Sequence, residues 1–529
     1  MTRDIEWVLM AVEPLPRGDW LLQATNVLRQ AGFSVKARPS QLLAWDEQPR
    51  SGNLTYSDAY SVRRIWLSPR RHALGVFSRR IYFKGTGGEI DKRQEYVVLG
   101  NSPRPESPAA TELIAKQWRL IQCLQKGLQT PSKPVPLEPL EVGKARVLTI
   151  DGNTFFSPPA SVMALYREHG FEHIPGGFTV SVCPLESVPT AVARKFSERL
   201  AQAARKMHAG MKPRITSLTK VSERLEDIKN SGEKVREGHC VLFILPSKKQ
   251  KAKEATVALF RALREAAVPF RRAYADDPLD HSVPDQLPSL LIAAGGRPHC
   301  SLTQTAGTPA WTIGVDISHP NEQPISVLAL TLVDPDGGLV GAWTKEQPRD
   351  ETARVETVRA LLTHCKQKLS TYDPGSPIVV FRDGRIFENE DGNLYRDSLE
   401  RDVSFFEYRK RGNPQIVRFG TTLMLPSEPL ATSLHGTSTM FVTIAPPRAN
   451  QLARVAKITW RKEWNYLRLT PREVGEILAA SATAPGLGPN TRHVPASIYW
   501  ADGIAGIRPK GATQRDLRFV GMPHEKIGG

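Results

Sequence analysis

Apolar residues between positions 311 and 343 follow the spacing of β-strands. Largely apolar, β-branched runs at 311–317 and 325–333 predict two strands, and a shorter run at 339–343 predicts a third. Asp334-Pro335-Asp336-Gly337-Gly338 separates the second run from the third and favours a tight turn. This part of the chain is therefore expected to form a strand followed by a β-hairpin.

Helical spacing replaces strand spacing in the next stretch. Six apolar residues predict a helix with one buried face: Val355, Val358, Leu361, Leu362, Cys365 and Leu369. A last apolar run at 378–381 predicts a buried strand with Asp383 at its exit. The order strand, hairpin, helix, strand is typical of a ribonuclease H-like α/β fold. In that fold, a carboxylate of the first strand lies beside one that follows the strand after the helix.

Four acidic residues stand in unusually narrow sequence contexts. Asp316 lies near the end of a predicted buried strand, where Asp is disfavoured. Glu351 follows the break at Pro348, Asp383 precedes a glycine, and Asp502 follows Tyr-Trp-Ala. Each one alone also fits a cap or a turn. Together they predict a site where carboxylates hold two hard divalent cations, Mg²⁺ or Mn²⁺, for in-line phosphodiester cleavage.

Around these residues the sequence resembles the Argonaute family, specifically its PIWI nuclease domain, across residues 311–507. Asp316 in GVDISHP, Asp383 in VVFRDG and Asp502 in PASIYWADGIA are similar to the first, third and fourth members of that family's catalytic tetrad. The stretch around Gly436-Thr437-Ser438 resembles the segment before the family's final helices. The resemblance implies that the three aspartates are catalytic metal ligands.

The second member of that tetrad is a glutamate on a mobile loop before the first helix. The Gln-x-Arg-x-Glu pattern of residues 347–351 selects Glu351, and Glu346 is the alternative. The resemblance thus implies a metal-dependent endonuclease that uses two Mg²⁺ or Mn²⁺ ions. It implies a short single-stranded guide and a complementary target strand, DNA or RNA, and a role in host defence. Base pairing would read the sequence while the protein holds the backbone.

Composition points to a polyanionic partner. The 529-residue chain has a formal net charge of +17, which favours nucleic acid and salt-dependent binding, although a basic chain can also reflect solubility alone. Five scattered cysteines show neither zinc-site nor disulfide spacing, which together with the absence of a signal-like N-terminus predicts a cytoplasmic location. The apolar runs are too short for a membrane span, so no membrane partner is expected.

Four segments are predicted along the chain: an N-terminal and linker-like region at 1–145, a linker at 146–177, a MID-like domain at 178–309 and a PIWI domain at 310–529. The first segment reads as mixed α+β, with a strand at 7–12, a helix at 21–30, a hairpin of 79–84 with 94–99, a helix at 111–125 and a proline-rich linker at 130–139. It is too short to hold the family's PAZ domain as well, so PAZ is expected to be absent.

The third segment alternates strands and helices and predicts a small Rossmann-like domain where the family places MID. Its elements are a strand at 178–183, a basic helix at 189–211, a buried strand at 240–245, a lysine-rich loop at 246–253 and a helix at 254–267. A loop before a helix N-terminus suits an anion. We therefore predict that the guide's 5′ end binds Lys248, Lys249, Lys251, Lys253 and Arg271, although the lysines also fit a solvated charge run.

The resemblance is incomplete at this predicted pocket. Ala252, Thr256 and Ala293 stand where the family carries its 5′-phosphate-binding residues, and Phe270 or Arg271 meets an expected Gln. Either the lysines and Arg271 replace that pocket, or the guide carries a different 5′ end group. Two smaller features are also open. Residues 405–411 fit a backbone-tracking surface or an ordinary strand, and His319 fits a metal contact or a strand cap.

Two other functions remain open from the sequence. A non-cleaving, guide-binding target sensor would act with a partner effector protein; the complete tetrad argues against it, and the missing PAZ domain argues for it. A guide-free ribonuclease H-like or transposase-like nuclease would not need the MID-like segment upstream of the carboxylates. Guide-dependent cleavage accounts for both features.

Overall fold

The computed structural model divides the chain into two compact units. The first joins residues 1–142 with 408–460, and the second joins 143–407 with 461–529. The structure describes residues 6–13, 19–46, 56–68, 71–84, 89–90, 110–128, 133–142, 146–148, 154–156, 173–185, 187–206, 214–217, 239–247, 270–277, scattered positions between 256 and 302, 310–320, 323–372, 376–387, 390–419, 422–444, 452–482, 493–506 and 525–527. Among these residues no helix is long and apolar enough to cross a membrane.

The second unit contains the predicted ribonuclease H-like sheet. Its strands are β15 (Trp311–Ser318), β16 (Ile325–Val333), β17 (Leu339–Pro348) and β18 (Ile378–Asp383). β16 lies antiparallel between β15 and β17, and β18 runs parallel to β15 on the other side. The predicted order is confirmed, although β17 extends beyond residue 343 to Pro348.

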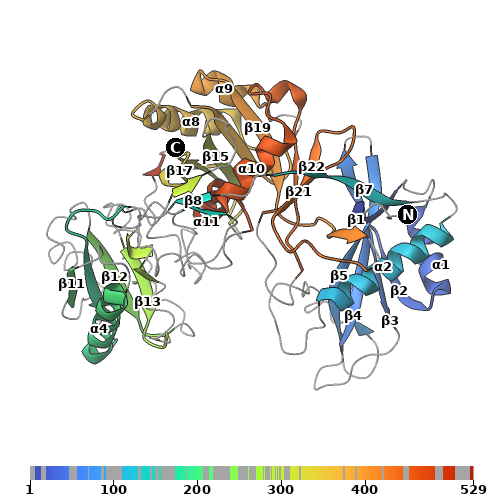
Figure 1. Cartoon of the computed structure of the whole chain (residues 1–529), viewed down its shortest axis with the longest axis horizontal. Helices are drawn as coiled ribbons and strands as arrows, with labels where there is room; N and C mark the ends of the chain where they lie inside the picture. The colour runs from blue at the N-terminus through green and yellow to red at the C-terminus, as the bar shows by residue number, and fades with distance from the viewer. Residues whose placement is uncertain are drawn as a thin grey trace. The chain divides into compact units, whose positions relative to one another are not determined.

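Helices cover both faces of this sheet (Figure 1). α8 (Val355–Leu369) packs its predicted apolar stripe against one face, together with Ile313 and Val315. α11 (Ala496–Ala505) packs against β15 and β16 on the other face, where Trp500 contacts the cluster around Ala329. Burial on both faces explains why these strands read as continuous apolar runs rather than as alternating ones. α9 (Asn393–Leu399), β19 (Val403–Arg409), the short 3₁₀ helix η1 (Lys462–Trp464) and α10 (Pro471–Ser481) complete the described elements around it.

A short C-terminal strand extends the sheet beyond β17. β24 (Glu525–Lys526) pairs parallel with Trp343 and Thr344, and the Ile527 N–H donates to the Thr344 carbonyl oxygen at 2.8 Å. The Ile527 side chain packs against the α8-side core. The sequence beyond residue 507 predicted no structure, because two paired residues are too few to show a period.

The predicted Rossmann-like segment forms a second, fully parallel sheet in the same unit. Its strand order is β11 (Arg214–Ser217), β10 (Thr179–Pro184), β12 (His239–Leu245), β13 (Phe270–Tyr274), and α4 (Thr190–Lys206) packs beside β10 and β11. The predicted strands at 178–183 and 240–245 and the basic helix are confirmed, whereas most of the expected helix at 254–267 lies outside the described residues. The expected linker is not free of structure, since β8 (Arg146–Leu148) and β9 (Thr154–Phe156) pair there and β14 (Cys300–Leu302) joins β8.

The first unit is mixed α+β, as predicted. It contains β1 (Glu6–Glu13), α1 (Trp20–Gln30), β2 (Phe33–Arg38), β3 (Gln41–Asp46), β4 (Tyr56–Ser68), β5 (Arg71–Lys84), β6 (Glu89–Ile90), α2 (Ala110–Gly127), β7 (Lys133–Leu140), β20 (Ile416–Phe419), β21 (Leu430–Ser433), β22 (Thr439–Thr443) and β23 (Ala456–Thr459). The predicted β1, α1 and α2 are confirmed, whereas β2, β3 and β4 were not predicted. β5 pairs with β4 and with the short β6, and the expected partner at 94–99 lies outside the described residues.

The predicted linker at 130–139 is wrong, because this stretch forms strand β7. It pairs antiparallel with β1 and, through residues 138–140, with β21. Val135 and Leu137 are buried while the prolines alternate with them. Since successive N–H groups of a strand face opposite edges, Pro134 and Pro136 remove donors from one edge only. Residues 408–460, predicted as part of the PIWI segment, share this unit with the N-terminal region.

Candidate metal centre

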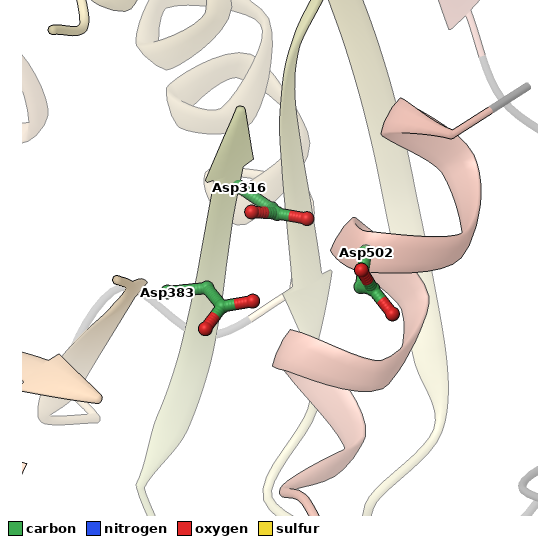
Figure 2. A group of neighbouring side chains, drawn as sticks. All are labelled: Asp316, Asp383 and Asp502. Atoms are coloured by element: carbon green, nitrogen blue, oxygen red, sulfur yellow. The ribbon is translucent and has the colours of Figure 1, made fainter. Parts of the chain in front are cut away.

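Three aspartates from separate elements converge in the second unit. One carboxylate oxygen from each of Asp316, Asp383 and Asp502 lies within 4.8 Å of the others. Figure 2 shows the three side chains facing a common space, two from neighbouring strands and the third from α11. These are three of the four residues predicted from the sequence as metal ligands.

The register of two parallel strands brings the first pair together. Val315 on β15 pairs with Arg382 on β18, so the next step along both strands places Asp316 beside Asp383. Side chains alternate between the two faces of a sheet, and Val315 points towards the α8 side. Asp316 and Asp383 therefore point towards the α11 side. Gly384, at φ +91°, then turns the chain away in a conformation that favours glycine.

A glycine allows α11 to reach this face closely. A Cβ atom added at Gly314 would lie 2.2 Å from the Ser497 carbonyl oxygen of α11. The Thr331 hydroxyl of β16 donates to that same oxygen at 2.8 Å. The first turn of α11 is thus fixed directly on β15 and β16, and Asp502 follows less than two turns later.

The donor set suits hard divalent cations. Asp316 and Asp383 are only 8% and 7% exposed, and carboxylates at this spacing repel one another when charged. A divalent cation would offset that repulsion, and carboxylate oxygens are the ligands that Mg²⁺ and Mn²⁺ prefer. The backbone N–H of Ile317 donates to Asp316 Oδ1 at 2.9 Å, which helps to orient this carboxylate.

Glu351 does not join the three aspartates. Its side chain is 74% exposed, and its Oε1 lies 3.3 Å from His319 Nε2. His319 Nδ1 lies 2.8 Å from the Ser326 hydroxyl, so the imidazole bridges β16 and the loop that carries Glu351. The alternative, Glu346, is exposed on β17 and is also outside the group of three. The role predicted for Glu351 stays a prediction.

The backbone around Glu351 is nevertheless held by buried groups that the sequence did not reveal. Arg382 Nη2 donates to the Glu351 carbonyl oxygen at 3.3 Å, and Arg382 Nη1 donates to the Asp383 carbonyl oxygen. The same guanidinium pairs with Glu390 at 3.3 Å, with both side chains more than nine-tenths buried. Glu390 Oε1 in turn accepts the Ala353 N–H at 2.9 Å. One buried ion pair therefore ties the Glu351 loop to the strand end that carries Asp383.

Comparisons with known proteins agree with this architecture. No model of a protein family matches the chain, and no curated protein does. Solved structures do match. An Argonaute from Marinitoga piezophila, determined with a 5′-OH guide RNA and target DNA, is similar over 94% of this chain and 85% of its own, with a TM-score of 0.64 and 10% identity. Drosophila Piwi covers 95% and 85% with a TM-score of 0.60 and 12% identity. The C-terminal lobe of a budding yeast Argonaute covers 73% and 89% with a TM-score of 0.55 and 12% identity.

The chain has an Argonaute-type fold. This confirms the predicted fold class, a ribonuclease H-like PIWI domain preceded by a Rossmann-like MID domain and a mixed N-terminal region. In this Argonaute-type fold the three aspartates lie on the PIWI sheet and on the helix that covers it.

The predicted guide-binding residues are only partly described. Lys248, Lys249, Lys251 and Lys253 lie outside the described residues, as do Ala252 and Ala293. Arg271 is described on β13, where its Nη1 donates to the Phe270 carbonyl oxygen at 3.0 Å. Burial lowers the pKa of Arg271, whereas Cys240 and Tyr499 act in the opposite direction. Binding of the guide's 5′ end by this Argonaute-type MID domain stays a prediction.

The aromatic residues of 405–411 belong to the core of this Argonaute-type fold. Phe405, Phe406 and Tyr408 are each at most 2% exposed, so they cannot stack on nucleic acid. The ordinary-strand interpretation is therefore right for them. Only Arg409, Lys410 and Arg411, at the end of β19 and just after it, retain solvent exposure.

Gly314→Ala should weaken both the fold and the metal centre. The added methyl group would meet the α11 backbone, which cannot rotate away, so we expect a loss of about 1–3 kcal/mol in unfolding free energy. Displacing α11 would also move Asp502. Urea unfolding and divalent-ion titration measure the two effects. Gly176→Ala is the matched control, because a Cβ there meets nothing within 4 Å. Equal stability of the two variants would contradict the close approach.

Glu390→Ala should destabilise the second unit strongly. It leaves the Arg382 guanidinium buried without its acidic partner, a change that costs about 3–5 kcal/mol. Glu356→Ala is the control, since Glu356 pairs with Arg354 at 3.9 Å on an exposed surface. Such surface pairs contribute about 1 kcal/mol or less. Chemical unfolding compares the two. Similar losses would show that the buried Arg382–Glu390 pair stabilises the fold no more than an exposed pair does.

Proposed function

We propose that this protein is a guide-dependent endonuclease. It would hold a short single-stranded guide and cut the complementary nucleic-acid strand by metal-dependent phosphodiester hydrolysis. The convergence of Asp316, Asp383 and Asp502 within 4.8 Å, on the sheet and helix of an Argonaute-type fold, supports this proposal most directly. The net charge of +17 supports a polyanionic partner.

The three aspartates would act as oxygen ligands. Asp316 and Asp383 would hold one side of the centre from adjacent strand positions, and Asp502 would close it from α11. These carboxylates would hold divalent ions, which would supply charge stabilisation for the attacking and leaving oxygens of an in-line displacement. Glu351 would complete the ligand set by leaving His319 and turning towards the aspartates. Because its backbone is tied to Arg382, this change would take place mainly in its side chain.

The guide is proposed by analogy with the Marinitoga piezophila structure, which contains a guide RNA with a 5′-hydroxyl and a target DNA. That end group needs no phosphate pocket, and the family's phosphate-binding residues are replaced here by Ala252, Thr256 and Ala293. This accords with a reduced preference for a 5′-phosphate. The non-cleaving sensor acting with an effector protein is the second candidate, because Glu351 lies outside the group of three.

Asp316→Ala and Asp383→Ala should each abolish cleavage while nucleic-acid binding persists. Each change removes a ligand at the point where the two strands meet, and the activity of a two-metal centre depends on all its ligands. Cleavage of a labelled complementary strand and filter binding measure the two properties. Asp336→Ala is the control, because Asp336 lies in the turn between β16 and β17. Full cleavage by either variant, or in excess chelator, would exclude this centre. A wild-type protein that binds but never cuts would favour the sensor.

Glu351→Ala should reduce cleavage by roughly 100-fold or more, as expected when a second-metal ligand is lost. Glu346→Ala should leave the rate within about threefold of the wild type, because Glu346 lies on β17 outside the converging carboxylates. Single-turnover rates at saturating Mg²⁺ or Mn²⁺ distinguish the two variants. The opposite ranking would assign the second carboxylate to Glu346.

A further inference from the structure

An exposed cluster of planar side chains ends the β4–β5 hairpin of the first unit. Trp66 and His72 oppose each other across the hairpin, with ring centroids 3.8 Å apart at an angle of 60°. The Arg64 guanidinium carbon lies 5.1 Å from the Trp66 ring centroid, and Arg64 Nε donates to His72 Nδ1 at 3.2 Å. Trp66 is nevertheless 52% exposed.

The backbone beneath this cluster is fixed by neighbouring strands. Lys457 on β23 donates to the Trp66 carbonyl oxygen at 2.6 Å. The Thr439 hydroxyl of β22 donates to the Leu67 carbonyl oxygen at 3.0 Å. Both donors are at most 6% exposed, so the hydrogen bonds are shielded from water. The hairpin therefore presents the indole from an ordered strand end, which lowers the entropic cost of binding a ligand there.

Arg63, the residue before Arg64, forms a cation–aromatic pair that the protein covers and that therefore has a structural role. Arg63 lies 4.1 Å from the Phe77 ring centroid and donates to the Gly412 carbonyl oxygen at 3.0 Å. Phe77 is only 7% exposed, so this pair is covered by the protein itself. The Arg64–Trp66 pair lies one residue further on, and Trp66 is 52% exposed.

The positive charge of Arg64 beside the Trp66 ring indicates which kind of ligand the cluster would bind. Burial and the nearby Arg64 lower the pKa of His72, so the imidazole is neutral near pH 7 and Arg64 supplies the positive charge. An exposed indole beside an arginine suits a nucleobase that stacks on the ring while its phosphate meets the guanidinium. The net charge of +17 brings such a polyanion to the surface.

We propose that Trp66, flanked by Arg64 and His72, binds a nucleobase in a single-stranded segment of the guide or the target strand. This inference rests on the proposed function, since it takes the nucleic acid to be the guide or the target. It adds a contact in the first unit, whereas the aspartates belong to the second. The contact would read no sequence, because every base offers a face to stack on.

Trp66→Ala should weaken binding of single-stranded nucleic acid by roughly 5- to 100-fold, the range expected for loss of one base stack. Trp66→Phe should restore most of the affinity. Leu22→Ala is the control, because Leu22 is 58% exposed on α1 of the same unit and offers no ring. Fluorescence anisotropy with labelled guide strands, and with guide–target complexes that retain single-stranded ends, measures affinity. Thermal unfolding checks that all variants are folded.

Photocrosslinking identifies the strand. A 5-iodouracil base is placed at one position at a time, first in the guide and then in the target, and the crosslinked peptide is identified by mass spectrometry. A crosslink to Trp66 from the guide assigns the contact to the guide, and one from the target assigns it to the target. No crosslink from any position of either strand, with unchanged affinity of Trp66→Ala, overturns the inference. A wild-type protein that binds neither strand overturns the proposed function itself.

Discussion

Parallel pairing of β15 with β18 is the constraint on which the candidate centre depends. The two strands are separated in sequence by a hairpin and a helix, and their register alone brings Asp316 beside Asp383. A shift of one residue in either strand would turn that strand's carboxylate to the α8 side, into the apolar core. The apolar residues that face α8 therefore fix the carboxylates on the opposite face. The chemistry of this site is specified by hydrophobic packing on its reverse side.

The position of the third carboxylate, Asp502, depends on a glycine, Gly314. Gly314 lies two residues before Asp316 on the same face, and the absence of a Cβ there lets the α11 backbone contact the strand. Small residues of the sheet and helix, such as Ala329 and Ala496, allow the same close approach nearby. Glu351 is positioned differently, through a hydrogen bond from Arg382 to its backbone carbonyl oxygen and a side-chain contact with His319. The carboxylate itself is exposed beside His319.

The sequence predicted this region well because local signals agree with the fold. The strand runs and the apolar stripe of α8 are long enough to show their period, and the residues of the Asp334–Gly338 segment are typical of a turn. Asp316 and Asp383 followed from motifs at the ends of two of those strands, whereas Asp502 was assigned from its own motif through the family resemblance alone. Other features depend on distant partners that a local pattern does not contain. The prolines of β7 predicted a linker, because its strand conformation depends on pairing with β1 and β21. The contacts of Arg382 could not be predicted either, because its partners, Glu390 and the Glu351 loop, are identified only by the fold.

The two proposed nucleic-acid contacts, the aspartate centre and the Arg64–Trp66 cluster, carry opposite charges. The chain as a whole is strongly basic, yet the centre that would cut the strand is a group of three carboxylates, of which Asp316 and Asp383 are buried and Asp502 is partly exposed. A phosphate approaching those carboxylates alone would be repelled, since like charges at this distance in a partly buried site interact strongly. Bound divalent cations would make the electrostatic potential at the carboxylates positive. On the proposed function, metal and target strand must therefore each favour the binding of the other, as linked equilibria require. The Arg64–Trp66 cluster carries positive charge without any ion. It would hold single-stranded nucleic acid whether or not the metal centre is filled, so binding and cutting would respond to different conditions.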